Sequence, residues 1–222
     1  MAESELHSAL KSFCAQPGDR FEVNVEGYFV DVLRGNLLIE IQTGSFHHLK
    51  PKLFALLENH PIRIVYPIAV GRWIEKRSAE DNQLIERRKS PKIGRIEQIF
   101  TEMDSFPGLI LHPNLEIQVV LINDVVVRIN DGKGSWRRKG WRTIDRRIES
   151  ILSEKVFSKP EDFLELLPQG LPAVFSRREL AVAMKAPLLT AQKMVYCLHR
   201  MGMLSITRKH GRTLYYSVNL PG

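Results

Sequence analysis

The segment from Phe21 to Gly44 constrains the fold of this chain more than any other stretch. Two runs of apolar and β-branched residues flank the turn Arg34-Gly35-Asn36, and this pattern predicts a β-hairpin. An apolar helix and a further apolar strand follow in the sequence. We therefore expect a sheet at the centre of the molecule, with helices packed on it.

Acidic residues interrupt this hairpin at two places that strand pairing brings together. Asp31 lies near the end of the first strand and Glu40 near the end of the second. Side chains alternate along a strand, so Glu40 and Gln42 are expected on one face, with Ile39 and Ile41 on the other. Two carboxylates close together in an apolar sheet repel each other unless they share a proton or bind a cation. Oxygen ligands of this kind suit Mg2+ or Mn2+. The alternative is that Asp31 is an ordinary turn residue and Glu40 an ordinary solvated one.

The spacing of these residues resembles a known enzyme family. Asp31, followed nine residues later by Glu40-Ile41-Gln42 at the end of an apolar strand, resembles the PD-(D/E)XK nuclease superfamily, whose fold is restriction-endonuclease-like. The resemblance implies that Asp31 and Glu40 hold a catalytic Mg2+ or Mn2+ ion, with the carbonyl of Ile41 as a further ligand. It also implies that Gln42 orients or activates the attacking water. Lys is commonest at that last position and Gln cannot supply its charge, which leaves Lys50 as the candidate cation near the scissile phosphate.

Composition points to a polyanionic partner. The chain has 222 residues, 44% of them apolar, and a formal net charge of +7. This length allows one large domain or two small ones with real cores, and the positive charge favours nucleic acid. Cys14 and Cys197 lie far apart in helical patterns, which predicts reduced, buried thiols. No apolar run reaches membrane-spanning length and the N-terminus lacks a signal-peptide pattern, so we expect a cytoplasmic protein without a membrane partner.

Hydrophobic periodicity and turn signals predict the order of the remaining elements. A helix, two or three strands, a helix and a strand form the core expected of the nuclease fold, so the predicted fold class is α/β with a mixed sheet flanked by helices. Glu5 on the first helix is a candidate to face the metal. The predicted helices are Glu3–Ala15, Lys52–Asn59, Arg95–Met103 and Thr143–Ser153. A strand is predicted over Ile62–Val70 that continues to Lys76 and pairs with a returning strand over Gln83–Arg87. Two further strands, Leu115–Ile122 and Val125–Ile129, are predicted with a turn at Asn123-Asp124 between them.

Two basic stretches are candidates for contact with nucleic acid. The first lies just before a predicted helix N-terminus and would bind phosphate, with a solvated linker as the alternative. It consists of Arg87, Arg88, Lys89, Lys92 and Arg95. The second is a glycine-rich loop in which cations can pair with phosphates and tryptophans can stack, with a surface loop whose tryptophans pack back on the fold as the alternative. It consists of Lys133, Trp136, Arg137, Arg138, Lys139, Trp141 and Arg142, with Arg146 and Arg147 on the helix that follows.

The pattern changes after residue 153, and we expect a second domain over residues 154–222. A short helix over Glu161–Leu167 is predicted first, then a capping box at Ser176 that opens a helix through Met184. Thr190 is the predicted cap of a helix through Met201, and a hairpin over Met203–Arg208 and Thr213–Val218 follows.

Three helices and a basic two-stranded hairpin resemble the winged-helix domain. The resemblance implies that the third helix lies in the major groove of DNA and that the hairpin, or wing, contacts the backbone or the minor groove. Many winged-helix domains bind proteins instead. The residues nominated for DNA are Thr190, Gln192, Lys193 and Arg200 on the helix and Arg208, Lys209, His210 and Arg212 on the wing, and those nominated for the core are Leu189, Val195, Leu198 and Leu204.

Together these patterns predict a magnesium-dependent deoxyribonuclease domain over residues 1–153 and a winged-helix domain that assists binding of DNA, expected to be double-stranded. The predicted reaction is hydrolysis of a DNA phosphodiester by a water that the metal activates. A catalytically inactive nuclease fold acting as a DNA-binding or transcription-regulatory protein is the alternative, and a protein-interaction module is the third. A homodimer remains open, since nothing in the sequence defines an interface.

Overall fold

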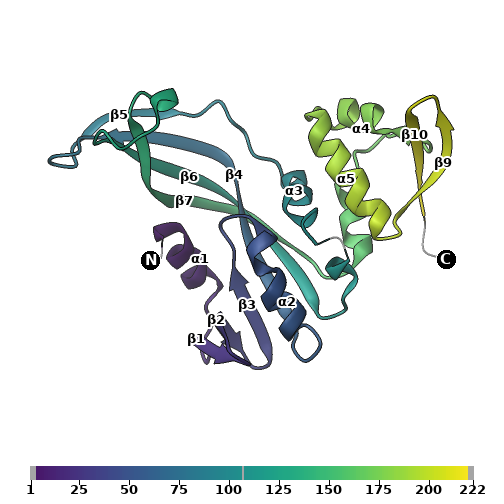
Figure 1. Cartoon of the computed structure of the whole chain (residues 1–222), viewed down its shortest axis with the longest axis horizontal. Coiled ribbons are helices and arrows are strands. Elements are labelled where there is room, and N and C mark those ends of the chain that lie inside the picture. The colour runs from purple at the N-terminus through teal and green to yellow at the C-terminus, as the bar shows by residue number, and fades with distance from the viewer. Residues whose placement is uncertain (1–3, 107, 220–222) are drawn as a thin grey trace.

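The computed structural model describes residues 4–106 and 108–219, and Figure 1 shows how their helices and strands are arranged. Within those residues a mixed sheet of seven strands runs in the order β1-β2-β3-β4-β6-β7, with β5 paired to β4. β3, β4 and β6 are parallel, and the other pairs are antiparallel. The predicted α/β class with a mixed sheet is confirmed. The strands are β1 (Arg20–Val25), β2 (Tyr28–Arg34), β3 (Leu37–Ile41), β4 (Ile62–Arg77), β5 (Leu84–Lys89), β6 (Leu115–Asn130) and β7 (Trp141–Phe157).

The predicted hairpin forms the first part of this sheet. Val32 pairs with Ile39 and Arg34 with Leu37, so the turn falls where the sequence placed it. Gly35 sits in this turn with φ +58°, a conformation that other residues rarely adopt. The pairing fixes which side chains of β3 face each side of the sheet.

Helices cover both faces of the sheet. Leu6 and Leu10 of α1 (Glu5–Cys14) pack on one side, here called the α1 face. α2 (Lys50–Leu56) and α3 (Ile99–Met103) cover the opposite side, here called the α3 face. Single 3-10 turns connect several elements: η1 (Phe46–Leu49), η2 (Ile96–Gln98), η3 (Leu109–Leu111) and η4 (Trp136–Arg138). Four leucines in and around α2 are buried against the sheet: Leu49, Leu53, Leu56 and Leu57.

The prediction of two short strands joined at Asn123-Asp124 is wrong, because β6 continues through both residues. The pairing of β6 with β7 shifts register next to Asn123, so a bulge replaces the turn. Asp124 is fully buried, and its carboxylate accepts hydrogen bonds from Arg72 of β4 at 2.8 and 2.7 Å. Arg146 of β7 also donates to Asp124. Charge pairing therefore lets an acidic residue, which sequence patterns assign to a turn, lie inside the sheet.

The predicted helix over Thr143–Ser153 is also wrong, since β7 spans Trp141–Phe157. Ile148 and Ile151 are three residues apart, a helical spacing, and both pack on the α1 face. Register shifts between β6 and β7 put them on the same side of a strand. The predicted domain boundary after Ser153 consequently falls inside β7.

The C-terminal unit, residues 158–219, consists of short helices and a small sheet of strand order β8-β10-β9. The capping box is confirmed, because Ser176 Oγ accepts from the Glu179 amide and the Ser176 amide donates to Glu179. Thr190 was predicted to cap the next helix, but that helix begins at Leu188. The elements are η5 (Pro160–Leu166), β8 (Phe175–Ser176), α4 (Arg177–Met184), α5 (Leu188–Arg200), β9 (Leu204–His210) and β10 (Thr213–Val218).

The C-terminal unit packs against the α3 face through α5, which lies beside α3 in Figure 1. Lys193 of α5 forms an ion pair with Asp104 at the end of α3. Cys197 is a free, buried thiol whose sulfur lies 3.6 Å from the carbonyl oxygen of Phe100, and burial raises its pKa to about 12. Leu189 was predicted to be a core residue, but it is 59% exposed because α5 turns its other sides to α3 and α4. None of the helices in the described residues is long and apolar enough to span a bilayer.

We expect the Asp124→Asn variant to lose about 3 to 5 kcal/mol of unfolding free energy, because two arginines lose the charge that compensates their desolvation. Urea unfolding followed by circular dichroism measures this loss. Glu80→Gln, at an exposed turn, is the control and should leave the midpoint unchanged. Equal midpoints for Asp124→Asn and the wild type would show that the buried carboxylate does not stabilise the sheet.

Candidate functional site

Asp31 lies where the hydrogen-bond ladder between β2 and β3 ends. Its Oδ2 atom accepts a hydrogen bond of 2.7 Å from the amide of Ile41 and lies 3.3 Å from Nε2 of His7. His7 belongs to α1. The carboxylate of Asp31 therefore lies between the two strands and meets a side chain from the α1 face.

Glu40 belongs to the opposite face. Together with Leu38 and Leu53 it lines a small apolar space between β3 and α2. Its Oε2 atom lies 2.5 Å from Nζ of Lys52, and the same ammonium donates to the carbonyl of Phe29. Burial raises the pKa of Glu40 above its usual value, Lys52 opposes this shift, and the negative charge of Asp31 adds to it.

The two predicted acids therefore interact electrostatically, although their contacts come from opposite faces of the sheet. The predicted alternation along β3 is confirmed, because Ile39 and Ile41 are buried on the α1 face while Glu40 faces α2. The Glu40 carboxyl also accepts a hydrogen bond from the backbone of Asp31, which ties the two acidic residues together. Carboxylate oxygens are hard donors of the kind that Mg2+ or Mn2+ prefers. Within residues 4–106 and 108–219 there is no group of three or more His, Cys, Asp or Glu side chains suited to a metal.

Gln42 continues the same row of side chains. Its amide nitrogen donates to the carbonyl of Ser45 at 2.6 Å, which leaves its side-chain oxygen as an acceptor with no partner in the described part of the chain. The backbone amide of Gln42 donates to the carbonyl of Val65 on β4. This hydrogen bond places Gln42 beside Tyr66, the next residue of that strand. Gln42 thus stands between Glu40 and the open part of the α3 face.

Sequence reasoning missed Lys52 as the cation at this site. Helical periodicity assigns Lys52 to solvent, and only the packing of α2 on β3 brings its ammonium to Glu40. Lys50, the candidate named for this role, stands at the start of α2 and has no ionic or hydrogen-bonding side-chain contact within the described residues. Glu5 was a candidate to face the metal, but its carboxyl hydrogen bonds with Asp145 of β7, and this contact raises its pKa.

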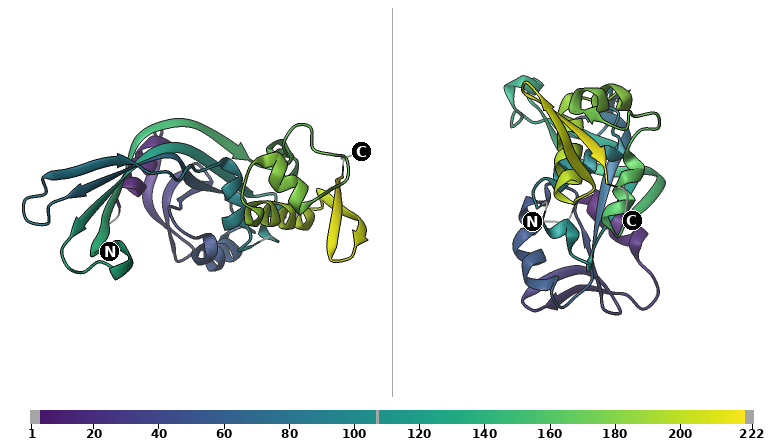
Figure 2. Two further views of the ribbon diagram at one scale, coloured as in Figure 1. Left: turned by 90° about the horizontal axis from the view of Figure 1, so that it is seen from above. Right: turned by 90° about the vertical axis from the view of Figure 1, so that its right-hand side faces the viewer.

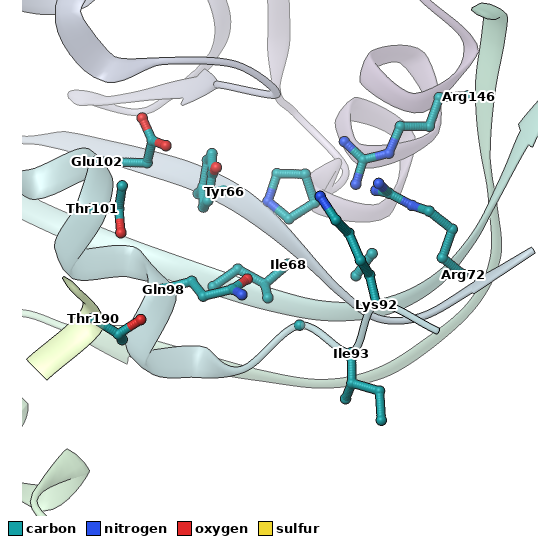
Figure 3. A pocket seen from close by; sticks show the side chains of 13 residues that line it. Tyr66, Ile68, Arg72, Lys92, Ile93, Gln98, Thr101, Glu102, Arg146 and Thr190 are labelled. Atoms are coloured by element: carbon teal, nitrogen blue, oxygen red, sulfur yellow. The ribbon is translucent and has the colours of Figure 1, made fainter. Parts of the chain in front are cut away.

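A cavity of about 510 Å3 lies on the α3 face next to Tyr66 (Figure 3). One end is cationic, with Lys92 beside the two arginines that bind Asp124, namely Arg72 and Arg146. At the other end burial and then the carboxylate of Glu102 raise the pKa of Tyr66 to about 12. The remaining lining residues are Pro67, Ile68, Ala69, Ile93, Gly94, Gln98, Thr101 and Thr190.

Further along the same face lies a second group of cations, here called the Arg128 group: Arg72, Arg88, Arg128 and Arg138. Sequence reasoning named Arg88 and Arg138 but not Arg72 or Arg128. The Nε atom of Arg128 is buried and has no hydrogen-bond partner within the described residues. Burial lowers the pKa of Arg128, and the positive charges of Arg138, Arg88 and Arg72 lower it further. Arg128 pairs with Lys76 in the sheet, and Arg88 pairs with Ile74, so these side chains share the face of Arg72. The only sequence signal was a charged residue at the end of an apolar strand.

Strand pairing divides the first predicted basic stretch between the two faces. Arg87 and Lys89 lie over the ring of Trp73, at 5.0 and 6.0 Å from its centroid, on the side away from Arg88. Lys92 lines the cavity, and Arg95 forms an ion pair with Glu97. The predicted helix beside this stretch is present from Ile96, with Arg95 at its N-cap, but it begins as a 3-10 turn and not as an α-helix.

The glycine-rich loop contains both exposed and packed residues. Trp136 is 83% exposed, with Arg137 at 5.6 Å from its ring centroid, and Arg138 takes part in the Arg128 group. Trp141 begins β7, and the ammonium of Lys76 lies 5.1 Å from its ring centroid, as expected of a tryptophan that packs back. Arg142 binds Asp131 at 2.7 Å and holds the pKa of Asp131 down to about 2. The exposed cations of the loop are Lys133, Arg137, Arg138 and Lys139.

Arg146 and Arg147, predicted on a helix, lie on β7 and face opposite sides. Arg146 binds Asp124 on the α3 face. Arg147 binds Glu75 at 2.9 Å on the α1 face. Only Arg146 therefore contributes to the cavity.

The candidate DNA contacts of the C-terminal unit fall into two sets. Thr190 lines the cavity and Lys193 binds Asp104, so both side chains face the large sheet, and Gln192 beside them is half-buried. The remaining candidates are exposed, and the guanidinium of Arg208 lies 4.4 Å from the ring centroid of Tyr215. They are Arg200 at the end of α5 and Arg208, Lys209, His210 and Arg212 on the β9–β10 hairpin.

The chain is a mixed α/β protein with two interacting acids on a hairpin and a row of cations along one face of its sheet. It belongs to the family described as Domain of unknown function (DUF8091), whose model matches residues 4–158 and so covers the seven-stranded sheet with α1, α2 and α3. It is similar to an uncharacterized protein of Treponema pallidum (strain Nichols), with 32% identity over 227 residues that cover 99% of this chain and 87% of the relative. No solved structure matches the chain.

We expect Glu40 to make the protein less stable as pH rises. Its folded-state pKa is raised, so the stability it contributes is present at low pH and is lost as pH rises through that pKa. Urea unfolding between about pH 4 and pH 7 should show the stability of Glu40→Gln rising relative to the wild type. Glu80→Gln, at an exposed position, is the control. A difference between Glu40→Gln and the wild type that is constant with pH contradicts the raised pKa.

Proposed function

We propose that the protein is a metal-dependent DNA endonuclease of the PD-(D/E)XK type, with a winged-helix domain that assists DNA binding. The observation that carries the proposal is the position of Glu40, a partly buried carboxylate influenced by Asp31, on the face of the sheet that also bears Arg72, Arg128 and Arg146. A hydrolase of phosphodiesters needs an acidic centre for the metal and a cationic surface for the substrate. Glu40 and these cations lie on the α3 face, and Asp31 lies beside Glu40 between β2 and β3.

Asp31, Glu40 and the carbonyl of Ile41 would hold Mg2+ or Mn2+. Such an ion, when bound, lowers the pKa of a bound water and neutralises charge on the phosphate. Gln42 uses its amide nitrogen for Ser45, so its free oxygen can accept a hydrogen bond from the attacking water. In the hydrolysis that water would lose a proton to solvent and form the new bond to phosphorus as the bond to the leaving oxygen breaks, and the leaving oxygen would take a proton from solvent.

Lys52 supplies the positive charge that Gln42 lacks. Its ammonium lies 2.5 Å from Glu40 and offsets part of the cost of burying that carboxylate. A Lys has three rotatable donors, so the same group can also bind a phosphate oxygen. The position of Lys52 on α2 supports this role in place of Lys50.

The Arg128 group and the β9–β10 hairpin are the proposed DNA contacts outside the acidic centre. The buried Nε donor of Arg128 has no partner in the described residues and lies near three other arginines, which costs folding free energy unless an anion is bound. The phosphates of a duplex would provide that anion. The exposed cations of the wing and of the glycine-rich loop would bind backbone phosphates in the same way.

A DNA-binding or regulatory protein with an inactive nuclease fold is the second candidate. The observation that favours it is the ion pair of Lys52 with Glu40, which already neutralises one acid, together with the uncharged Gln42. Cleavage of DNA separates the two candidates.

We expect the wild type to nick or cut plasmid DNA with Mg2+ or Mn2+ and to be inactive in EDTA. Asp31→Asn and Glu40→Gln should cut about 100-fold more slowly or worse, since a catalytic metal contributes several kcal/mol. Asp81→Asn, at an exposed turn, is the matched control. Cutting by both site variants at the wild-type rate removes the site assignment, and a wild type that binds DNA without cutting it supports the second candidate.

We expect the affinity for DNA to fall as the salt concentration rises. Arg128→Gln should reduce the slope of the logarithm of the association constant against the logarithm of the salt concentration by about 1. The substitution also removes a buried donor without a partner, so folding stability should not fall. Fluorescence anisotropy in EDTA measures the slope. Arg20→Gln, on the exposed strand β1, is the control, and equal slopes for Arg128→Gln and Arg20→Gln would place Arg128 outside the DNA interface.

A further inference from the structure

We propose that the cavity on the α3 face holds one unpaired nucleotide of the substrate, with its phosphate at Lys92, Arg72 and Arg146 and its base at the Tyr66 end. This inference rests on the proposed function for the identity of the substrate as DNA. It adds a structural requirement that the acidic centre alone does not impose, namely a nucleotide outside the duplex.

The cationic end has spare capacity for an anion. Three cations meet one acid there, because Arg72 and Arg146 share Asp124 and Lys92 has no ionic partner among the described residues. Arg146 uses its Nε atom for Asp124, so its two terminal nitrogens remain available as donors. Figure 3 shows the ends of these three side chains close to one another at the same end of the cavity. A phosphate suits this arrangement, because guanidinium groups bind it through paired hydrogen bonds.

The loop that carries Lys92 is held in place before any ligand arrives. The amide of Ser90 donates to the carbonyl of Arg72 at 2.7 Å, and the amide of Gly94 donates to the carbonyl of Ala69 at 3.0 Å. A Cβ atom at Gly94 would lie 2.2 Å from that same carbonyl oxygen, so only glycine allows this approach. The cationic end is therefore preorganised, which lowers the entropic cost of binding.

The opposite end offers groups that suit a base. Tyr66 and Ile68 provide an aromatic ring and an apolar side chain, while Gln98, Thr101 and Glu102 provide hydrogen-bonding atoms. Figure 3 shows these side chains at the end away from Arg146. A base needs a flat apolar contact together with donors and acceptors for its edge. An anion without a base would leave this half of the cavity unused.

The size of the cavity excludes a duplex. About 510 Å3 lies within the range of pockets for small ligands, and Thr190 of α5 lines one side. A nucleotide can enter only from a DNA end, a gap, a branch or an extruded base. Tyr66 of β4 lies beside Gln42, which follows β3 on the neighbouring strand. A nucleotide in the cavity therefore lies next to the proposed acidic centre.

The test measures binding of the full chain in EDTA, without cleavage. Fluorescence anisotropy compares a blunt duplex with the same duplex carrying a short single-stranded overhang. We expect the overhang to improve affinity about 10-fold, which corresponds to one well-bound nucleotide. Lys92→Gln should abolish most of this preference, while Lys185→Gln, an equal change of charge at an exposed position at the end of α4, should preserve it.

Competition identifies the bound group. A deoxynucleoside monophosphate should displace the overhang at lower concentration than the nucleoside or inorganic phosphate does. Equal affinity for blunt and overhanging DNA, or an overhang preference that survives in Lys92→Gln, overturns the inference. Competition by inorganic phosphate as strong as that by the monophosphate overturns it too, because it shows a site for an anion alone. A protein that never cuts DNA but still prefers overhangs refutes the proposed reaction and keeps this inference.

Discussion

Two arginines from different strands share one carboxylate at the centre of the sheet. Asp124 on β6 is fully buried, and Arg72 on β4 and Arg146 on β7 bind it from either side. A buried carboxylate is tolerated only when its charge and its hydrogen bonds are both satisfied. The interaction therefore fixes the three longest strands at the point where their pairing shifts register. It also sets the direction of two guanidinium groups that line the cavity.

The charges on the sheet are separated by face as a consequence of this pairing. On the α1 face several acids accompany the arginines: Glu75 binds Arg77 and Arg147, Glu149 binds Arg87, and Glu5 lies against Asp145. On the α3 face, one carboxylate serves two arginines, and Arg128 lies among like charges without a partner for its Nε atom in the described residues. Net positive charge is thus concentrated on the face that also bears Glu40. Total charge alone does not reveal this distribution, because both faces contain many basic residues.

Local patterns in the sequence predicted the hairpin and the alternation of β3, because turn residues and period-two spacing act over a few residues. They failed on β6 and β7, where a bulge gives Ile148 and Ile151 a helical spacing and buries Asp124 in place of a turn. The acids of the candidate site could be named from sequence. Their partners, His7 and Lys52, could not, since helices packed on opposite faces bring them there. The same holds for the cavity, which five separate segments build.

The arrangement of the C-terminal unit limits how the proposed contacts with DNA would be made. The N-terminal half of α5 faces the large sheet, through Thr190 at the cavity and Lys193 at Asp104, so those side chains are not presented outward to a groove. The exposed cations lie on the β9–β10 hairpin, at the opposite end of the molecule from the glycine-rich loop (Figure 2). A polyanion that contacts both ends must run along the length of the sheet. Such a path passes the Arg128 group and the cavity, which would bring a phosphodiester to Glu40 by charge alone, without base-specific contacts from α5.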